Sequence, residues 1–425
     1  MHRHGTITYG WFVLLVCMIW PLPGKTQQTT DSCTTCHREL GVEQLTKPVL
    51  DFEQDIHKAK GFGCVSCHGG DATQEDIVEA MNPAKGYIGK PTPQQIPEVC
   101  GHCHADARFM KRYNPAARVD QVTEYYTSVH GQRLRELDDI KVATCTSCHS
   151  AHTIRPASDP KAGMHPLKVA ETCGTCHADP QYMETYNIPT DQLQTYKKSI
   201  HWKTMKASGD LSAPTCNDCH GNHGATPPGI SWIGNVCEQC HAVVAELFDK
   251  SPHDEIFVQI GTPGCTACHG DHDISKTTDE MIGLGSQAAC ATCHVAGDKG
   301  GETAVAMRGF IDSLRAEFDE AQQLLRQAEH AGMEVSQAQF EINGAKDHLV
   351  KARTAVHTFA VKAVQQEVTE GMAIATNARA RGVQALDEIQ FRRMGLGISV
   401  VIILAIITGL VFKIRQIDQK GEHRD

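Results

Sequence analysis

Residues 103–149 read CHADARFMKRYNPAARVDQVTEYYTSVHGQRLRELDDIKVATCTSCH, and residues 176–220 read CHADPQYMETYNIPTDQLQTYKKSIHWKTMKASGDLSAPTCNDCH. Each stretch begins within one C-x-x-C-H motif and ends on a complete second motif. Shorter versions of the second half begin at Asp55 and Ser251. The chain is therefore built on a repeat with two motifs in each unit.

The C-x-x-C-H motif occurs nine times and uses 18 of the 19 cysteines; Cys17 is left over. The cysteine pairs are Cys33/Cys36, Cys64/Cys67, Cys100/Cys103, Cys145/Cys148, Cys173/Cys176, Cys216/Cys219, Cys237/Cys240, Cys265/Cys268 and Cys290/Cys293. The histidines that follow them are His37, His68, His104, His149, His177, His220, His241, His269 and His294.

This spacing has a chemical reason. Two thiols three positions apart can bind both vinyl groups of one porphyrin, and the next histidine can then bind the iron as proximal ligand. Disulfides and zinc sites are the alternatives for paired cysteines, but neither requires a histidine after every pair. The sequence therefore predicts nine covalently bound haem c groups.

A second axial ligand is expected for most of these irons. His57, His130, His201 and His253 stand in a D/S-x-H pattern ahead of the second motif of a unit, and His152, His223 and His272 follow a motif histidine by three residues. Recurrence at fixed positions of the repeat favours these seven as distal ligands. The further candidates are His165, His102, Met81 and His357. An iron without a second ligand is expected at Cys64 or Cys100.

The composition changes after the last motif, so two regions are expected. Residues 31–296 form a cytochrome c domain with little regular secondary structure. Residues 302–391 show helical spacing of apolar residues, with a turn near residue 331 and a fresh helix start near Ser336. The pattern continues through Val356 and Phe359, and predicts a hairpin or small bundle of long antiparallel helices. The expected fold class is mainly α.

Two apolar segments predict export and a membrane anchor. Residues 1–26 resemble a signal peptide, with an apolar run from Trp11 to Trp20. Residues 394–412 are 19 residues without a charge, flanked by arginine and lysine, which is typical of one transmembrane helix. Residues 413–425 would then be a cytoplasmic tail, with the motif region on the periplasmic side of the cytoplasmic membrane. The formal charge of −10 argues against nucleic acid as a partner.

With these features the chain resembles the membrane-anchored multihaem cytochromes c of bacterial anaerobic respiration. The matching segments are the S-x-H…C-x-x-C-H-x-x-H units, AMNPAKG from Ala80, RYNP from Arg112, EHAGMEV from Glu329 and FRRMGL from Phe391. The resemblance implies an electron-transfer protein of the membrane and periplasm. Its expected partners are quinol or a cytochrome b-type membrane subunit on one side and periplasmic redox proteins on the other.

Two other functions stay open at this point. One is a reductase or oxidase of a small nitrogen or sulfur compound at a haem with an open coordination site. The C-x-x-C-K motif that often marks the active haem in the similar nitrite reductase family is absent from this sequence, which favours the carrier. The other is a scaffold whose helical tail docks a partner.

Overall fold

The computed structural model describes residues 31–227 and 233–421. The predicted signal peptide at residues 1–26 lies outside the described residues. Within them the chain is helical and contains no strand, which confirms the expected mainly α class. The chain divides into two compact units: the part up to Asp120 with Ala143–Pro156, and Gln121–Val142 with the part from Ala157 onward.

The motif region consists of short helices joined by loops. Its elements are α1 (Ser32–Glu39), α2 (Glu43–Phe52), α3 (Ile56–Ala59), α4 (Val65–His68), α5 (Ile77–Ala80), η1 (Pro83–Lys85), α6 (Ile96–His104), α7 (Ala107–Met110), α8 (Gln121–Thr127), α9 (Val129–Glu136), α10 (Cys145–His149), α11 (Pro166–His177), α12 (Pro180–Met183), η2 (Glu184–Tyr186), α13 (Gln192–Tyr196), α14 (Ile200–Ser208), α15 (Cys216–His220), α16 (Ile233–Asp249), α17 (Pro252–Ile260), α18 (Thr266–His269), η4 (Asp279–Met281) and η5 (Ala289–Thr292).

The D/S-x-H pattern has a structural reason, because its first residue is the N-cap of a helix. Ser128 and Ser199, both fully buried, accept hydrogen bonds from the first-turn amides of α9 and α14, and Asp55 does the same for α3. A side-chain cap of this kind stabilises a helix by about 1 kcal/mol. The cap also places the histidine two residues later in the first helical turn.

Backbone hydrogen bonds connect these capped helices to the loop that follows a later motif. The middle residue of D/S-x-H donates its N–H to a carbonyl two residues beyond a C-x-x-C-H-x-x-H sequence. The N···O distances are 2.9 Å for Ile56 to Ile154, 3.1 Å for Val129 to Ala225 and 2.7 Å for Ile200 to Ile274. The first three repeats are therefore each fixed to the next one along the chain.

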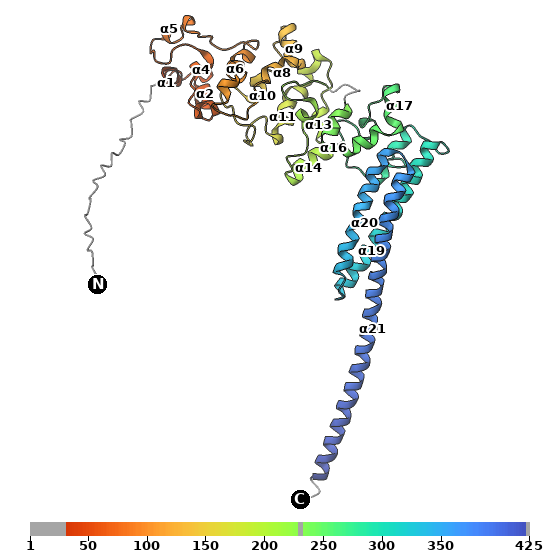
Figure 1. The fold of residues 1–425 in the computed structure, drawn as a ribbon. Helices are drawn as coiled ribbons and strands as arrows, with labels where there is room; N and C mark the ends of the chain where they lie inside the picture. Colours follow the sequence, from red (N-terminus) through yellow and green to blue (C-terminus); the bar gives the residue numbers. More distant parts are fainter. Residues whose placement is uncertain (1–30, 228–232, 422–425) are drawn as a thin grey trace, which may run out of the picture. The chain divides into compact units, whose positions relative to one another are not determined.

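Three long helices follow the motif region: α19 (Lys299–His330), α20 (Ser336–Ala355) and α21 (Val361–Gly421). In Figure 1, α19 and α20 pack against the first part of α21, and α21 then continues alone as one helix of 61 residues. We call the packed part of these helices the stalk. Its core contains Ile311 and Leu314, both fully buried. Burying such side chains contributes about 1.5–3 kcal/mol each.

One part of the helical prediction was wrong. The apolar pattern indicated a helix running on through Val356 and Phe359, but α20 ends at Ala355 and a turn, η6 (Val356–Thr358), separates it from α21. Phe359 has a φ of +50°, a left-handed conformation that ends the helical hydrogen bonding. The chain reverses there, so the stalk has three helices. The expected fresh start near Ser336 is confirmed.

The end of the stalk is followed by the predicted membrane segment. Ile389 is the last buried residue of α21, and the side chains from Phe391 to Ile417 are exposed. Among the described residues α21 is the one helix long and apolar enough to cross a membrane. An apolar surface of that length on an unpartnered helix is the expected property of a membrane span.

Candidate haem centres

The motif cysteines are available for covalent attachment. All 18 are partly or fully exposed. Most motifs lie on helices that end at the motif histidine, such as α10 and α15, where Thr144 and Thr215 form capping boxes. This local geometry keeps two thiols and one imidazole on the same short turn, as thioether attachment with proximal ligation requires.

The second cysteines of three motifs differ in their surroundings. Cys148 on α10 and Cys176 on α11 are half-buried. Burial and the contact with the Cys176 thiol together raise the pKa of Tyr182. Cys293 is exposed and lies outside the helical residues, because η5 ends at Thr292 and Cys293 is its C-cap. The sequence predicts a thioether at all three cysteines. Attachment there stays a prediction, and the ninth motif departs from the α-helical setting of the others.

The motif histidines face other histidines. Two imidazoles bound at about 2 Å to opposite sides of one metal ion have ring centres about 6 Å apart. Seven pairs with centres 6.0–6.4 Å apart are His57–His104, His68–His152, His130–His177, His201–His241, His220–His272, His253–His294 and His269–His357. Each pair joins one motif histidine to one predicted distal ligand. The donor set and its spacing therefore fit a metal-bound porphyrin between the rings.

Hydrogen bonds to Nδ1 orient several of these rings. His57 Nδ1 lies 2.9 Å from Oδ1 of the buried Asp55, and His68 Nδ1 lies 2.7 Å from the carbonyl oxygen of Gly89. A ring held at Nδ1 keeps Nε2 free for a metal, the arrangement usual for metal-binding histidines. Asp55 also accepts a hydrogen bond from the amide of Ile154, which connects the orientation of His57 to the neighbouring repeat.

Burial favours the neutral form of eight histidine rings in these pairs. It lowers the pKa of His130, His152, His177, His201, His220, His253, His269 and His357. Only an imidazole with an unprotonated nitrogen can bind a metal, so these rings are ready to act as ligands at neutral pH.

Consecutive motifs are neighbours in space within each of the two compact parts of the structure. In the first unit Cys33 lies close to Cys64, and a hydrogen bond between the thiols of Cys100 and Cys145 raises the pKa of Cys100. The other neighbouring pairs are Cys67–Cys103 in the first unit and Cys173–Cys216, Cys219–Cys240, Cys237–Cys265, Cys268–Cys290 and Cys268–Cys293 in the second. Within each unit the motifs therefore follow one another in space in their chain order.

The other predicted ligands have different surroundings. His165 is buried at the start of α11 and its Nδ1 accepts a hydrogen bond from the amide of Leu167, which is a helix-capping role. His102 is exposed on α6, and Met81 is the C-cap of α5. His223 Nδ1 lies 3.9 Å from a carboxylate oxygen of Glu124.

The motif histidines that face a second ring differ from the sequence expectation. The motifs at Cys64 and Cys100 were expected to lack a partner, yet His68 and His104 each face a histidine ring. Within residues 31–227 and 233–421, His37 is a motif histidine that faces no aromatic or imidazole ring. The repeat explains why His37 has no partner ring. When the motifs are numbered in chain order, each later odd-numbered motif pairs with the D/S-x-H histidine of the preceding repeat, and no repeat precedes the first motif.

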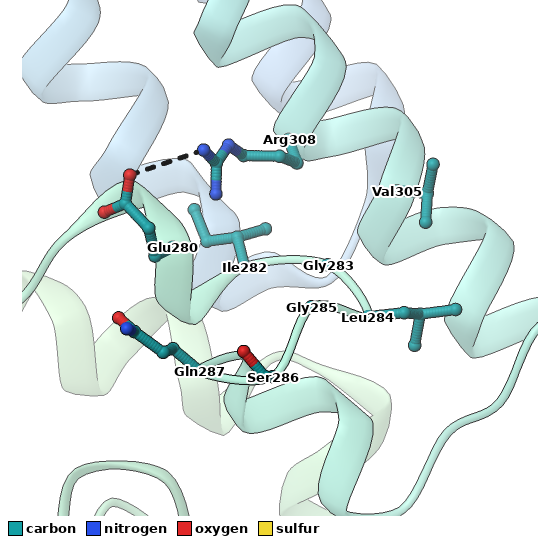
Figure 2. A pocket seen from close by; sticks show the side chains of 9 residues that line it. All are labelled: Glu280, Ile282, Gly283, Leu284, Gly285, Ser286, Gln287, Val305 and Arg308. Atoms are coloured by element: carbon teal, nitrogen blue, oxygen red, sulfur yellow. Dashed lines mark ion pairs between the residues drawn. The ribbon is translucent and has the colours of Figure 1, made fainter.

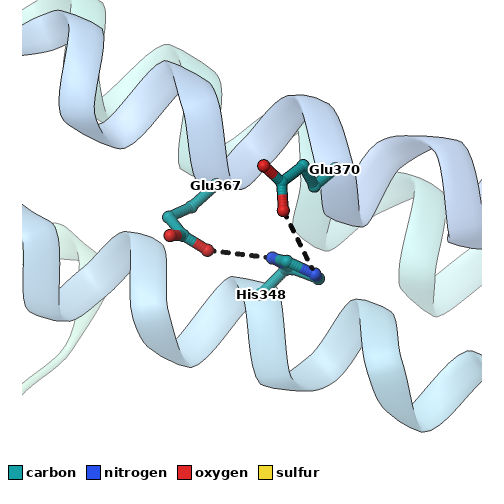
Figure 3. A group of neighbouring side chains, drawn as sticks. All are labelled: His348, Glu367 and Glu370. Carbon is teal, nitrogen blue, oxygen red and sulfur yellow. Dashed lines mark hydrogen bonds and ion pairs between the residues drawn. The ribbon is translucent and has the colours of Figure 1, made fainter.

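Two features outside the motifs were not predicted from the sequence. On the stalk, His348 of α20 lies between Glu367 and Glu370 of α21, with Nδ1 2.9 Å and Nε2 3.8 Å from the carboxylate oxygens (Figure 3). Each ring nitrogen faces a different carboxylate, so the group is a polar cross-link between the helices. The two glutamates three residues apart on α21 were the sequence signal that could have indicated this group.

The second feature is an open cavity of about 340 Å³ between α19 and the loop that precedes the last motif. Figure 2 shows its lining, in which Arg308 of α19 lies 3.5 Å from the carboxylate of Glu280. The same arginine contacts Asp312 one turn along α19. These ion pairs hold the loop against the start of the stalk.

The chain is similar to two named cytochromes. It is 23% identical over 302 residues to the multiheme cytochrome MtrA of Shewanella baltica, an alignment that covers 62% of this chain and 76% of MtrA. It is 23% identical over 220 residues to the C-type polyheme cytochrome OmcC of Geobacter sulfurreducens, covering 47% of this chain and 27% of OmcC. No protein-family model and no solved structure matches the chain.

Proposed function

Since this chain is a multihaem c-type cytochrome, we propose that it is a membrane-anchored electron carrier with nine haem c groups. It connects the quinol pool, through a quinol-oxidising or cytochrome b-type membrane subunit, with redox proteins on the periplasmic side of the cytoplasmic membrane. The similarity to two multihaem cytochromes supports the electron-transfer role. The nine C-x-x-C-H motifs support the number of haems, and the apolar segment of residues 394–412 supports the anchor and a partner in the membrane.

The observation that carries the proposal is the pairing of histidine rings. When bound, haem c supplies a one-electron iron centre at each motif. Two imidazoles on opposite sides of that centre leave no coordination position for a substrate, so such a site passes electrons without binding a reactant. Seven motif histidines have a second ring at 6.0–6.4 Å, which favours a carrier over an enzyme.

The order of the motifs supports a path for electrons along the chain. Neighbouring motif cysteines such as Cys33 and Cys64, or Cys237 and Cys265, bring consecutive sites together within each unit. Electron transfer between centres falls steeply with distance, so close consecutive sites are what a relay needs. We infer that electrons move between sites in chain order within each unit.

The stalk supports an indirect connection to quinol. The turn Val356–Thr358, just before α21 begins at Val361, contacts the motif region, whereas the apolar segment begins at Met394. At about 1.5 Å per residue this part of α21 is about 50 Å long. That length far exceeds a single tunnelling step, so a protein subunit is needed to deliver electrons from the bilayer to the sites beside the stalk.

Replacing a predicted distal ligand tests the carrier proposal. In ferric protein with His201→Ala we expect one low-spin haem to become high-spin in low-temperature EPR, because the iron at Cys237 and Cys240 loses its second imidazole. His330→Ala is the matched control, since His330 is exposed at the end of α19. A spectrum of His201→Ala identical to that of the control, or wild-type protein with mostly high-spin haems, would contradict the proposal.

The surroundings of His37 favour a second candidate function, a reductase or oxidase of a small nitrogen or sulfur compound at the first motif. His37 faces no ring within the described residues, so the iron bound at Cys33 and Cys36 is expected to keep one open position. Cyanide added to the ferric protein should then convert a high-spin EPR signal to low-spin, and the same signal should be absent from a Cys33→Ser/Cys36→Ser variant. Wild-type protein without any high-spin signal would exclude this function.

A further inference from the structure

The repeat follows a rule that assigns ligands between units. The histidine of the second motif in a repeat pairs with a histidine that lies three residues after the motif histidine of the next repeat. His68 pairs in this way with His152, and His220 pairs with His272. The loop that carries this later histidine also accepts the backbone N–H of a D/S-x-H helix, as Ile274 does from Ile200. Each such site is therefore completed by the repeat that comes next.

The last unit has no such repeat after it. Its second motif is Cys265/Cys268/His269, and the motif that follows at Cys290 has no H-x-x-H sequence. Its D/S-x-H sequence is Ser251-Pro252-His253, and proline has no N–H to donate. Pro252 therefore cannot make the backbone hydrogen bond by which the D/S-x-H helix of each earlier repeat is connected to the next repeat.

The turn between α20 and α21 lies where the next repeat would be. The rings of His357 and His269 have centres 6.1 Å apart and planes 21° apart, close to the parallel pairs within the repeats. The Phe359 ring lies 3.8 Å from that of His253, centre to centre, and so contacts the first turn of α17 (Pro252–Ile260). One turn therefore contacts both the motif histidine and the D/S-x-H helix that the loop of a following repeat would contact.

The structure assigns a new role to this turn: we propose that Val356–Phe359 is the terminal cap of the repeat array, in which His357 supplies the second axial ligand to the site at Cys265, Cys268 and His269. This inference rests on the proposed haem content. The stalk would then contribute a ligand to the eighth motif, at Cys265, Cys268 and His269. Arrays of repeats commonly end in an atypical unit that covers the last interface.

Local contacts hold His357 in position for this role. Its Nδ1 lies 3.0 Å from the carbonyl oxygen of Thr354 and donates a hydrogen bond to it, which leaves Nε2 for the metal. One helical turn earlier, Arg353 makes two hydrogen bonds of 2.7 and 2.8 Å to the carboxylate of Asp279. Asp279 is buried and lies on the segment that joins the eighth and ninth motifs.

Asp279 also binds a second helix of the stalk, with 3.0 Å between its Oδ2 and Arg315 on α19. Burial opposes the charge of this carboxyl group, but the hydrogen bonds and charge of Arg353, together with the charges of Arg315 and Arg308, outweigh burial and lower its pKa. Bidentate pairing between arginine and a buried carboxylate fixes geometry as well as charge. The last turn of α20 is therefore attached to the motif region just before His357.

The test uses the full-length protein with His357→Ala, His357→Met and His330→Ala. We expect His357→Ala to convert one low-spin haem to high-spin in EPR and near-infrared magnetic circular dichroism, and free imidazole to restore it. His357→Met is expected to keep that haem low-spin, with the band of a methionine-ligated iron and a raised reduction potential. His330→Ala should match the wild type.

Wild-type spectra from both His357 variants would overturn the inference. If His357→Ala does not accumulate as folded protein, His357→Met decides alone: a methionine-ligated haem supports the inference, and its absence from folded protein refutes it. These outcomes are separate from those of the carrier proposal, because His201→Ala reports on another site. A carrier with unchanged His357 variants would keep its proposed function and lose only the cap.

Discussion

In liposomes that contain only this protein and a quinol, the haems are expected to remain oxidised. The stalk separates the sites beside its turn from the start of the apolar segment at Met394 by about 50 Å of helix. A quinol headgroup stays at the bilayer surface and cannot reach them. Reduction should be followed by the absorbance of the ferrous haems, with a soluble low-potential reductant added at the end to show full reducibility.

The matched experiment adds the missing electron path. Membranes from the native host that contain a quinol-oxidising subunit should reduce the protein with the same quinol, and an inhibitor of quinol oxidation should stop this reduction. Slow or absent reduction in liposomes together with fast reduction in membranes supports the indirect connection. Fast reduction by quinol in liposomes would show that the stalk does not separate the redox sites from the bilayer.

The second large effect concerns the anchor. A chain that ends at Gln390 is expected to move from the membrane fraction to the soluble fraction almost completely, while it keeps its haem absorbance and the packed helices of its stalk. The reason is that Ile389 is the last buried residue of the stalk, so the truncation removes the apolar span without opening the core. The distribution between the fractions is measured by haem staining of separated membranes and supernatant.

A shorter truncation provides the control for the anchor. A chain that ends at Arg415 keeps the uncharged segment from Met394 to Phe412 and the flanking Lys413, so it should stay in the membrane fraction. A span of this length crosses the hydrocarbon core of a bilayer, about 30 Å thick. If the chain ending at Gln390 stayed in the membrane fraction after a high-salt wash, another part of the molecule would have to be the anchor.

The local features of this protein could be predicted from its sequence. The C-x-x-C-H motifs depend on residues within five positions of one another, so their chemistry needs no tertiary information. The D/S-x-H pattern also acts locally, because Ser128 and Ser199 cap the helices that carry His130 and His201. The helix start at Ser336 follows from a turn sequence and a shift of the apolar pattern.

The sequence by itself thus determined the haem-binding motifs, their repeat and most of the histidines available as second ligands. The tertiary structure decided which histidine faces which motif, because the paired rings come from different repeats that only folding brings together. It also decided the reversal at Phe359, where the contact with His253 and the ring of His357 against His269 outweigh a helical pattern. A periodic pattern records which side of a helix is buried, but it does not record where the chain must turn to meet a distant partner.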